Sequence, residues 1–594
     1  MSALGVKRTS QIFFDPRRTL RDGTKGVDQR LVSFPAFGST CVVPHLRNFH
    51  RAALFVPGAL FAKRSDIMTD PILIIGAGPT GLTAALELSR MGIAVRLIDK
   101  REGPATTSRA TGVQARTLEL FEQRGLADEM VRLGNRAEFG SVYGGGKSVF
   151  RFDFSHVGSR YPFLLFISQA ETERILREAA ARQGVTPEWN TELVGIGQDA
   201  LSHDASPAQA ILKLPDGRLQ RVAAPWLISA EGAHSLVRTT LDLPFEGHTR
   251  DEQYALGDLL VAGNLPNSDF HIFSSDHGFM ALFPMGGERF RLMASHPLSK
   301  PSKDAEPSLD ELQRIYDQRS HIPARFHDLT WSSWFRINSR MVSRLKVGRL
   351  LLGGDAAHIH SPAGAQGMNT GIQDMINLSW KLAMVVNGKA PPALLDTYEG
   401  ERLPVMRGVL FKTDKLTTAI GTENRVVRTL FNHFGPFIAG TRPVQENATA
   451  GMSQVALNYR KSSLSEDHSH GGSLRAGDRV PDMNIRLRSD SRWVETTLLS
   501  ALDPSQLTLV VAAPDGTTLP PNLRVSVPES RFLEIAADAK DRAPFESTFG
   551  KSGSAVLVRP DGYADLTTPI SSAADRVAAY RRKWFSASAA DARG

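Results

Sequence analysis

Four residues early in the chain have the types and spacing of a dinucleotide-binding turn: Gly76, Gly78, Gly81 and Asp99. In the pattern GxGxxG, the first glycine permits a tight turn, the second lets a pyrophosphate approach the backbone, and the third lets a helix pack closely on a strand. Asp99 follows at the spacing of a carboxylate that binds a ribose hydroxyl. The motif therefore predicts a dinucleotide site, but NAD and FAD satisfy it equally.

A second group with chemical potential lies much further along the chain. Asp355 follows two glycines, and Gly367, Met368 and Asn369 stand where a helical pattern begins. A carboxylate in this position can reach a chain of sugar-like hydroxyls. A helix that begins near Gly367 directs its free N–H groups at whatever lies before it and stabilises an anion there. Reduced flavin has an anionic ring edge of this kind, so the group favours a flavin.

Both groups follow apolar runs that predict buried strands. Residues 71–75 and 94–98 form two such runs, and a helical pattern over 82–91 separates them. Residues 348–353 form a third run, and a second long helical pattern follows Gly367. The sequence thus predicts an α/β fold with an FAD-binding Rossmann-like (βαβ) domain. Residues 254–296 alternate between apolar and polar types, which predicts an antiparallel sheet with a hairpin turn at Gly286-Gly287.

The composition excludes several classes of protein. The net charge of +8 lies almost entirely in residues 1–67, which hold eleven Lys and Arg against four Asp. The rest of the chain is nearly neutral, so we expect no nucleic-acid partner. The single cysteine, Cys41, excludes disulfides, dithiol exchange and thiolate metal sites from the body of the protein, and we expect no metal. No apolar run is long enough to span a membrane.

Residues 1–67 have no sustained hydrophobic period. An Arg-rich leader poor in acidic residues is similar to an organellar targeting segment. However, Met68 lies two residues before the first apolar run, as the start of an intact protein would. We interpret residues 1–67 as disordered or mis-started sequence without chemistry, and we expect the protein to be cytoplasmic.

Together, these motifs resemble the class A FAD-dependent aromatic monooxygenases, the group of para-hydroxybenzoate hydroxylase and the phenol and chlorophenol hydroxylases. The resemblance rests on the GxGxxG turn with Asp99, the segment EGAHSLVR at 231–238, and Gly354-Asp355, and it covers most of residues 70–585. One position departs from the family, because Glu231 stands where an aspartate is usual. That segment is associated with both FAD and NAD(P)H, so the extra methylene puts the pyridine-nucleotide step in question.

The resemblance implies FAD as cofactor and NAD(P)H as reductant. It also implies that reduced FAD adds O2 to give a C4a-hydroperoxide, which transfers oxygen to a small phenolic or other aromatic substrate. Asp355 would bind the flavin ribitol, and Gly367, Met368 and Asn369 would face the pyrimidine end of the ring. Arg109 and Gln169 match positions that contact the phosphate and sugar parts of the cofactor.

In this family the antiparallel sheet forms a wall over the flavin. The substrate-pocket candidates are Phe273, Met280, Leu282, Pro284 and Pro362. No catalytic base is assigned, because His358 and His360 near the flavin segment suit a structural role as well as an acid/base role. The family often forms homodimers, and the sequence leaves the oligomeric state open.

The predicted domain organisation follows from these assignments. The predicted parts are the leader at 1–67, the FAD-binding domain at 68–245 and 346–405, the inserted antiparallel-sheet substrate domain at 246–345, a helical segment at 406–461, a linker at 462–473, and a C-terminal domain at 474–594. By resemblance, the C-terminal domain would be thioredoxin-like.

Two kinds of alternative remain at this point. One is another flavin oxygenase of the same fold, namely an epoxidase, a Baeyer-Villiger type enzyme or a halogenase, although the segment from Trp331 to Trp334 lacks the halogenase pattern. The other is a nucleotide-binding protein without redox turnover. Such a protein would not oxidise NAD(P)H in air.

Overall fold

The structure is a computed structural model that describes residues 31–32, 41–42, 54–56, 70–106, 110–197, 207–296, 306–361, 364–420, 441–468, 471–490, 492–524 and 530–585. The predicted site residues Arg109 and Pro362 lie outside these ranges, as does most of the predicted leader. The chain divides into two units, Met1–Ala52 and Ala53–Gly594. In the first unit, β1 (Leu31–Val32) and β2 (Cys41–Val42) pair antiparallel.

A five-stranded sheet lies at the centre of the second unit, in the order β20-β21-β14-β4-β5. The strands are β4 (Ile72–Ile75), β5 (Val95–Ile98), β14 (Leu227–Ser229), β20 (Lys346–Val347) and β21 (Leu350–Leu352). All neighbours are parallel except β20 and β21. Ile72 and Ile74 join the hydrophobic core on one face, and Leu73 and Ile75 join a core on the other. Burial of both faces explains why β4 is an uninterrupted apolar run.

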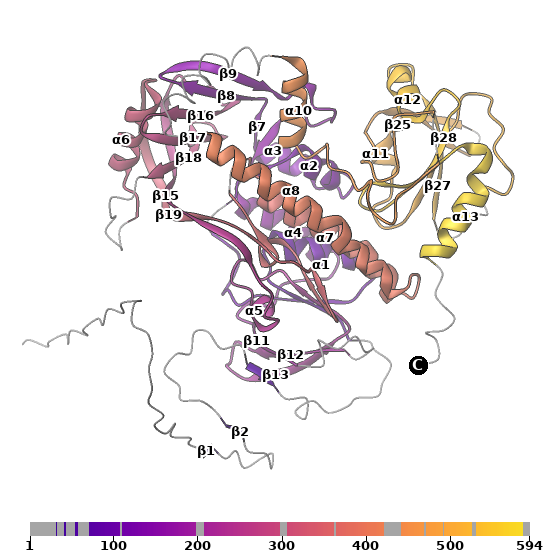
Figure 1. The fold of residues 1–594 in the computed structure, drawn as a ribbon, viewed down its shortest axis with the longest axis horizontal. Coiled ribbons are helices and arrows are strands. Elements are labelled where there is room, and N and C mark those ends of the chain that lie inside the picture. Colours follow the sequence, from indigo (N-terminus) through magenta and orange to yellow (C-terminus); the bar gives the residue numbers. More distant parts are fainter. Residues whose placement is uncertain are drawn as a thin grey trace, which may run out of the picture. The chain divides into compact units, whose positions relative to one another are not determined.

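Helices cover one face of this sheet. The helix α1 (Pro79–Arg90) packs against α4 (Gln169–Arg182) and α7 (Gly367–Val386), as Figure 1 shows. The expected strand, helix, strand unit is therefore present as β4, α1 and β5. Beside it lie α2 (Ala115–Glu122), α3 (Ala127–Leu133) and the small sheet of β6 (Gly112–Val113), β10 (Leu164–Phe166) and β7 (Asn135–Ala137).

The opposite face of the central sheet packs against a second, smaller sheet. Its strands are β13 (Leu219–Ala224), β12 (Ala208–Lys213), β11 (Glu192–Gly197) and β3 (Leu54–Val56), and the short helix α5 (Leu236–Thr240) lies beside β11. Apolar residues of both sheets and α5 form one buried cluster.

The predicted substrate sheet is present, with eight strands in the order β22-β19-β15-β18-β17-β16-β8-β9. The strands are β8 (Phe139–Gly144), β9 (Lys147–Asp153), β15 (Glu246–Gly263), β16 (Asp269–Ser275), β17 (Gly278–Gly286), β18 (Arg289–His296), β19 (Ala324–Met341) and β22 (His358–Ile359). The hairpin at Gly286-Gly287 is confirmed, because it joins β17 to β18 and both glycines have positive φ, +100° and +58°. β8 comes from earlier in the chain and pairs parallel with β16, so the sheet is not purely antiparallel.

The C-terminal part contains the long helix α8 (Asp396–Ile420), then α10 (Arg442–Met452) and a seven-stranded sheet. The strands of this sheet are β23 (Glu466–Asp467), β24 (Asn484–Ser489), β25 (Arg492–Thr497), β26 (Thr508–Ala512), β27 (Arg531–Ala537), β28 (Ser554–Val558) and β29 (Ala564–Thr568). Its helices are α11 (Leu498–Ala501), α12 (Arg542–Phe549) and α13 (Ala573–Trp584). The segment 462–473 differs from the predicted linker, because it supplies edge strand β23 and the buried Leu464.

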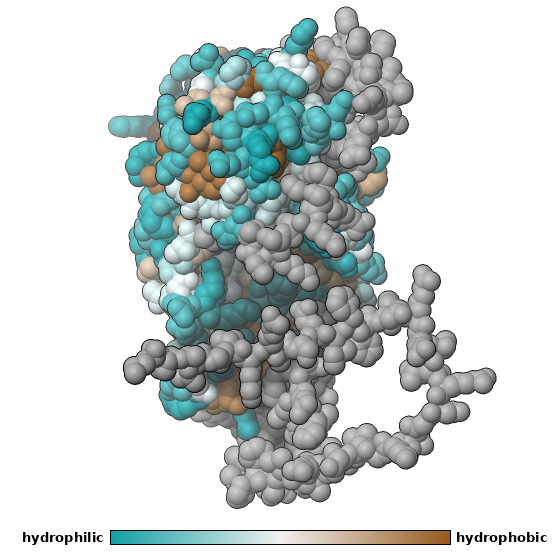
Figure 2. Space-filling model, turned by 90° about the vertical axis from the view of Figure 1, so that its left-hand side faces the viewer, coloured by the Kyte–Doolittle hydropathy of each residue, from teal (hydrophilic) through white to brown (hydrophobic). Residues whose placement is uncertain are grey.

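Within the described ranges, none of the helices combines the length and apolar character needed to cross a bilayer. Figure 2 shows a face that is mostly hydrophilic, with hydrophobic residues in small patches. The exposed large hydrophobic residues, such as Leu219 and Phe411, are few and far apart in the sequence. Isolated apolar residues of this kind are ordinary on protein surfaces.

Candidate cofactor site

The glycine turn between β4 and α1 is packed tightly on one side and open on the other. A Cβ on Gly76 would lie 2.3 Å from the carbonyl oxygen of Ala230. A Cβ on Gly81 would lie 1.8 Å from the carbonyl oxygen of Gly76. Gly76 also has a φ of +100°. In contrast, no described atom lies within 4 Å of a Cβ placed on Gly78. Fold packing therefore requires Gly76 and Gly81, whereas Gly78 faces the open space that a bound phosphate would need.

Asp99 lies at the end of β5 and fastens the glycine turn. Its carboxylate accepts hydrogen bonds from the backbone N–H groups of Ala77 (2.7 Å) and Arg101 (2.8 Å) and from the Arg101 guanidinium. Arg101 also pairs with Glu173 at 3.6 Å, and Glu173 accepts from the amide of Gln169 at 2.8 Å. The structure thus brings Asp99 and Gln169 into one network. Sequence reasoning missed Arg101 and Glu173, although Arg101 follows Asp99 by only two positions.

The segment that carries Asp355 meets the glycine turn directly. A Cβ on Gly354, whose φ is +58°, would lie 2.4 Å from the Thr80 hydroxyl in the first turn of α1. Asp355 is exposed although its neighbours Gly354 and Ala356 are buried. Its position suits contact with a ligand that lies across the start of α1.

Behind Asp355, the buried carboxylate of Asp374 holds this loop in place. Asp374 accepts from the backbone N–H of Gly354 (3.1 Å), from His358 Nε2 (2.7 Å) and from Arg402 Nε (2.7 Å). Burial alone would raise the pKa of Asp374, but Arg402 and His358 hold that pKa below its ordinary value. The ionised carboxylate is therefore a fixed acceptor for the loop. No motif in the sequence pointed to Asp374.

The helix α7 begins at Gly367, as the sequence predicted, and no side chain caps its N-terminus. Its first N–H groups, on Gly367, Met368 and Asn369, have no partner within the helix. The Asn369 side chain is committed to the protein, because it donates to the carbonyl oxygens of Gly112 and Ala365 and accepts from the Gln114 N–H. Only the backbone of Asn369 is therefore placed to face a ligand.

Glu231, which departs from the family pattern, serves as a helix cap. Its carboxylate accepts from the hydroxyls of Ser229 and Ser235, both at 2.7 Å, and from the N–H groups that begin α5. In the same segment, Arg238 donates to the Ala356 carbonyl oxygen at 3.0 Å. The three motif segments of the resemblance therefore meet at one place in the fold.

His360 lies beside the start of α7. Its ring is about 3.6 Å from the position of a Cβ on Gly367, and its Nδ1 lies 2.9 Å from the Ser361 carbonyl oxygen. Its Nε2 has no hydrogen-bond partner among the described residues. Burial and the neighbouring His358 lower the pKa of His360 to about 4, so the ring is neutral near pH 7.

The predicted pocket residues that the structure describes lie on one face of the eight-stranded sheet. Phe273, Met280 and Leu282 are fully buried in a core cluster with Leu312 and Tyr316 of helix α6 (Leu309–Ser320). Pro284 is two residues after Leu282 in β17, so it lies on the same face of the sheet. These residues pack beneath α6, and their assignment to a substrate pocket stays a prediction. The opposite face packs against the core of the central sheet and its helices through Phe270, Ile272, Phe283 and Met285. These four residues are the better candidates for a pocket wall.

Comparison with known proteins links this geometry to a family. The family model described as FAD binding domain matches residues 69–413. The 6-methylpretetramide 4-monooxygenase of Streptomyces rimosus is 35% identical, over 83% of this chain and 89% of its own. The pentachlorophenol 4-monooxygenase of Sphingobium chlorophenolicum is 33% identical, over 72% of this chain and 79% of its own. Among solved structures, the OxyS anhydrotetracycline hydroxylase of Streptomyces rimosus superposes with a TM-score of 0.70 and 27% identity, covering 87% of this chain and 99% of that one.

Proposed function

The chain belongs to the FAD binding domain family, and from this premise we propose how it acts as an FAD-dependent aromatic monooxygenase on a phenolic ring. It is an oxidoreductase, with FAD as cofactor and NAD(P)H as the reductant typical of the family. The observation that carries the proposal is the convergence of the open side of Gly78, the exposed carboxylate of Asp355 and the uncapped start of α7. A dinucleotide with a flavin at one end needs all three.

Each part of this site has a proposed binding role. The N-terminus of α1 and the backbone at Gly78 would hold the pyrophosphate, because free N–H groups and the helix dipole favour an anion. Asp99 would accept from the ribose of the adenosine, and Gln169 lies in the same network. The four acceptor positions of Asp99 are taken by Ala77 and Arg101, so the Arg101 side chain would have to yield one of them to the ribose.

At the other end, Asp355 would accept from the ribitol hydroxyls. The N–H groups of Gly367, Met368 and Asn369 would face the pyrimidine edge, where they stabilise negative charge. When bound, FAD supplies the chemistry: it carries electrons from NAD(P)H to O2 and so makes an oxygen atom transferable to an aromatic ring. The task of the protein is to hold the ring close and to exclude water.

We propose that the aromatic substrate packs against the inner face of β16 and β17. Phe283 and Phe166 have ring centroids 5.5 Å apart, and Phe166 approaches Gly112 in the strand that Asn369 fastens to α7. His360, beside the start of α7, is neutral, and its Nε2 could accept a hydrogen bond from a phenol. A flat, apolar wall with one acceptor suits a phenol.

The experiment that tests this function is oxidation of NADH and of NADPH by the purified, FAD-loaded protein in air. The assay is run with and without a panel of simple and polycyclic phenols, and hydroxylated product is scored against H2O2. We expect one class of phenol to accelerate oxidation and to retain an oxygen atom from O2 in the ring.

Other outcomes of the same assay identify other functions. Oxygen insertion beside a ketone or across an alkene would indicate a different flavin oxygenase. An FAD-containing protein that never consumes NAD(P)H with any phenol would contradict the monooxygenase mechanism and favour a binding protein.

A further inference from the structure

The helix α7 carries a buried polar stripe. Asp374, Asn377 and Lys381 follow one another at spacings of three and four residues, so they share one face of the helix. Each is at most 1% exposed. Buried charges and amides are costly unless they are paired, so the partners of this stripe matter to the whole helix.

One end of the stripe fixes the loop that carries Asp355. Asp374 accepts from the Gly354 N–H and from His358. Arg402 of α8 donates to Asp374 at 2.7 Å and to the Thr370 carbonyl oxygen, in the first turn of α7, at 3.1 Å. Arg402 and Asp374 thus join the candidate cofactor loop to the start of α7.

The other end of the stripe is bound to the neighbouring residue of α8. Asn377 and Lys381 both donate to Glu401 Oε2 at 2.7 Å. All three side chains are essentially inaccessible to solvent. Adjacent residues of α8, Glu401 and Arg402, therefore clamp α7 at two levels.

Glu401 accepts from the Ser462 hydroxyl at 2.7 Å and is also bound by the turn between β28 and β29. Two backbone hydrogen bonds of 2.9 Å make this turn tight. The Gly562 N–H donates to the Arg559 carbonyl oxygen, and the Arg559 N–H donates to the Tyr563 carbonyl oxygen. Gly562 has a φ of +75°, and a Cβ there would lie 3.1 Å from the Arg116 guanidinium. The tip of the turn is therefore closely packed against α2.

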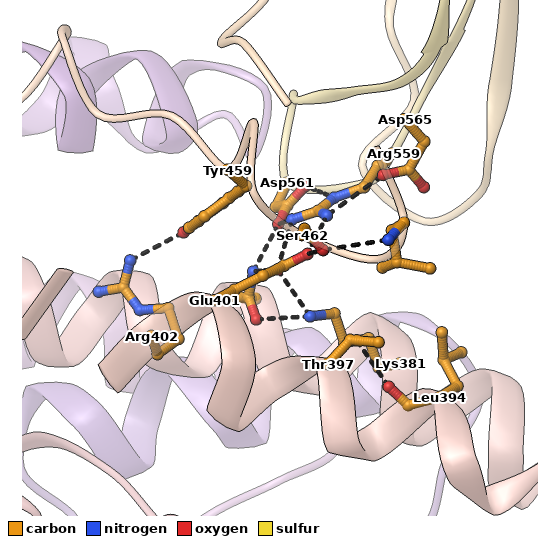
Figure 3. Close-up of polar contacts among 12 residues, drawn as sticks. Lys381, Leu394, Thr397, Glu401, Arg402, Tyr459, Ser462, Arg559, Asp561 and Asp565 are labelled. Carbon is orange, nitrogen blue, oxygen red and sulfur yellow. Dashed lines mark hydrogen bonds and ion pairs between the residues drawn. The ribbon is translucent and has the colours of Figure 1, made fainter. Parts of the chain in front are cut away.

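From this turn, Arg559 makes a two-pronged ion pair with Glu401, with N–O distances of 2.7 and 3.0 Å. Asp561 accepts from Asn377 at 3.1 Å and also pairs with Arg559. Figure 3 shows Arg559 pointing at Glu401 on α8, with Asp561 beside the Arg559 guanidinium and Lys381 on the other side of Glu401. The polar contacts of the turn thus end on Glu401, and the next residue of α8, Arg402, continues through Asp374 to the Gly354 N–H.

We propose that the turn 559–562 is a positioning element of the FAD site, in which Arg559 and Asp561 hold the loop at Gly354 through α7 and α8. The proposal rests on FAD binding as part of the proposed function. Arg559 fixes Glu401, Glu401 fixes Asn377 and Lys381, and the neighbouring Arg402 fixes Asp374 and the loop. Loss of the turn contacts loosens the loop before it unfolds the protein.

The test measures the FAD dissociation constant of the full-length apoprotein by quenching of flavin fluorescence. The variants are Arg559→Met, Arg559→Lys and Asp561→Asn. The control is Arg479→Met, because Arg479 also comes from the C-terminal part but pairs with Glu119 of α2 at 2.7 Å and does not contact the α7 stripe. We expect Arg559→Met to weaken FAD binding about tenfold, within the range of coupling through such networks.

We expect Arg559→Lys to recover part of the affinity, since lysine keeps the charge but cannot pair with Glu401 and Asp561 in the same planar geometry. Amide hydrogen exchange at Gly354 provides a readout that simple destabilisation would not move selectively. It is expected to quicken in Arg559→Met and Asp561→Asn relative to Arg479→Met.

If Arg559→Met does not fold, the isosteric Asp561→Asn decides the outcome alone. Folded variants that bind FAD as tightly as the wild type, with unchanged exchange at Gly354, would overturn the positioning role. Failure of the wild-type protein to bind FAD would instead overturn the proposed function, so the two failures are distinguishable.

Discussion

Gly78 and Gly81 belong to one motif but meet opposite surroundings. A Cβ on Gly81 would collide with backbone, whereas a Cβ on Gly78 would enter open space next to the start of α1. Gly78 has a φ of −79°, which alanine adopts without strain. The structural and binding roles of the motif can therefore be separated by two single substitutions.

We expect Gly81→Ala to lower the free energy of unfolding by about 1–3 kcal/mol, because the turn must shift to admit the methyl group. Gly78→Ala should change stability by less than about 0.5 kcal/mol but weaken FAD binding about tenfold, because the methyl group occupies the phosphate space. Urea unfolding of the apoprotein and titration with FAD measure the two effects. Equal FAD affinity in Gly78→Ala and the wild type would contradict a pyrophosphate at this turn.

For single residues, the sequence predicted the exposed residues of the candidate site better than the buried residues that hold them in place. The glycines and Asp355 belong to motifs whose spacing is local. Asp374 and Glu401 were missed because a buried charge inside a helix leaves no periodic signal, and its partners lie far away in the sequence. Asn369 was predicted to face the pyrimidine end of the flavin, and only the folded loop around Gly112 reveals that its side chain bonds to the protein, which leaves its backbone for that role.

Among the elements, strands and hairpins followed from the sequence, but the orientation of the substrate sheet did not. Alternation predicts which residues share a face, since side chains alternate along a strand. It cannot tell the two faces of β16 and β17 apart, because both are buried: one beneath α6 and one against the core of the central sheet. From the sequence, the pocket candidates Phe273, Met280 and Leu282 therefore could not be told apart from the residues of the opposite face.

The two buried faces predict a contrast between two phenylalanines of the same sheet. Phe283→Ala removes a half-buried ring from the inner face, so we expect it to change the Michaelis constant for the phenol about tenfold and stability little. Phe273→Ala empties a fully buried position beneath α6 and should cost about 3–5 kcal/mol of stability.

Steady-state kinetics and urea unfolding of the FAD-loaded variants measure this contrast. Unchanged substrate kinetics in Phe283→Ala would argue that the substrate lies elsewhere.

For the whole molecule, the sequence does not reveal how closely its parts are joined. Residues 462–473 are polar and contain glycine, which favoured a linker, yet β23 from this segment pairs with β29. Likewise, Arg559 and Asp561 give no sign in the sequence of their contacts with α7 and α8. Such contacts join residues almost two hundred positions apart, and they can be seen only in the folded chain.

The buried Asp565, which lies beside Arg559, predicts that the free energy of unfolding depends on pH. Burial raises the pKa of Asp565 from 3.8 to about 7, against the opposing effect of Arg559 and with the help of Glu401 and Asp561. Between these two pH values the folded protein keeps a proton that the unfolded chain releases, so the free energy of unfolding falls as the pH rises. This loss of stability is complete near pH 8 and is on the order of 4 kcal/mol.

We expect Asp565→Asn to remove much of this dependence, because the amide resembles the protonated carboxyl group and does not titrate. The variant should exceed the stability of the wild type by about 2 kcal/mol near pH 5 and by about 4 kcal/mol near pH 8. Urea unfolding at the two pH values measures the difference, and the exposed Asp515→Asn serves as a control in the same sheet domain. If Asp565→Asn and the wild type lose the same stability between pH 5 and pH 8, then Asp565 is already ionised in the folded protein and the Arg559 ion pairs outweigh its burial.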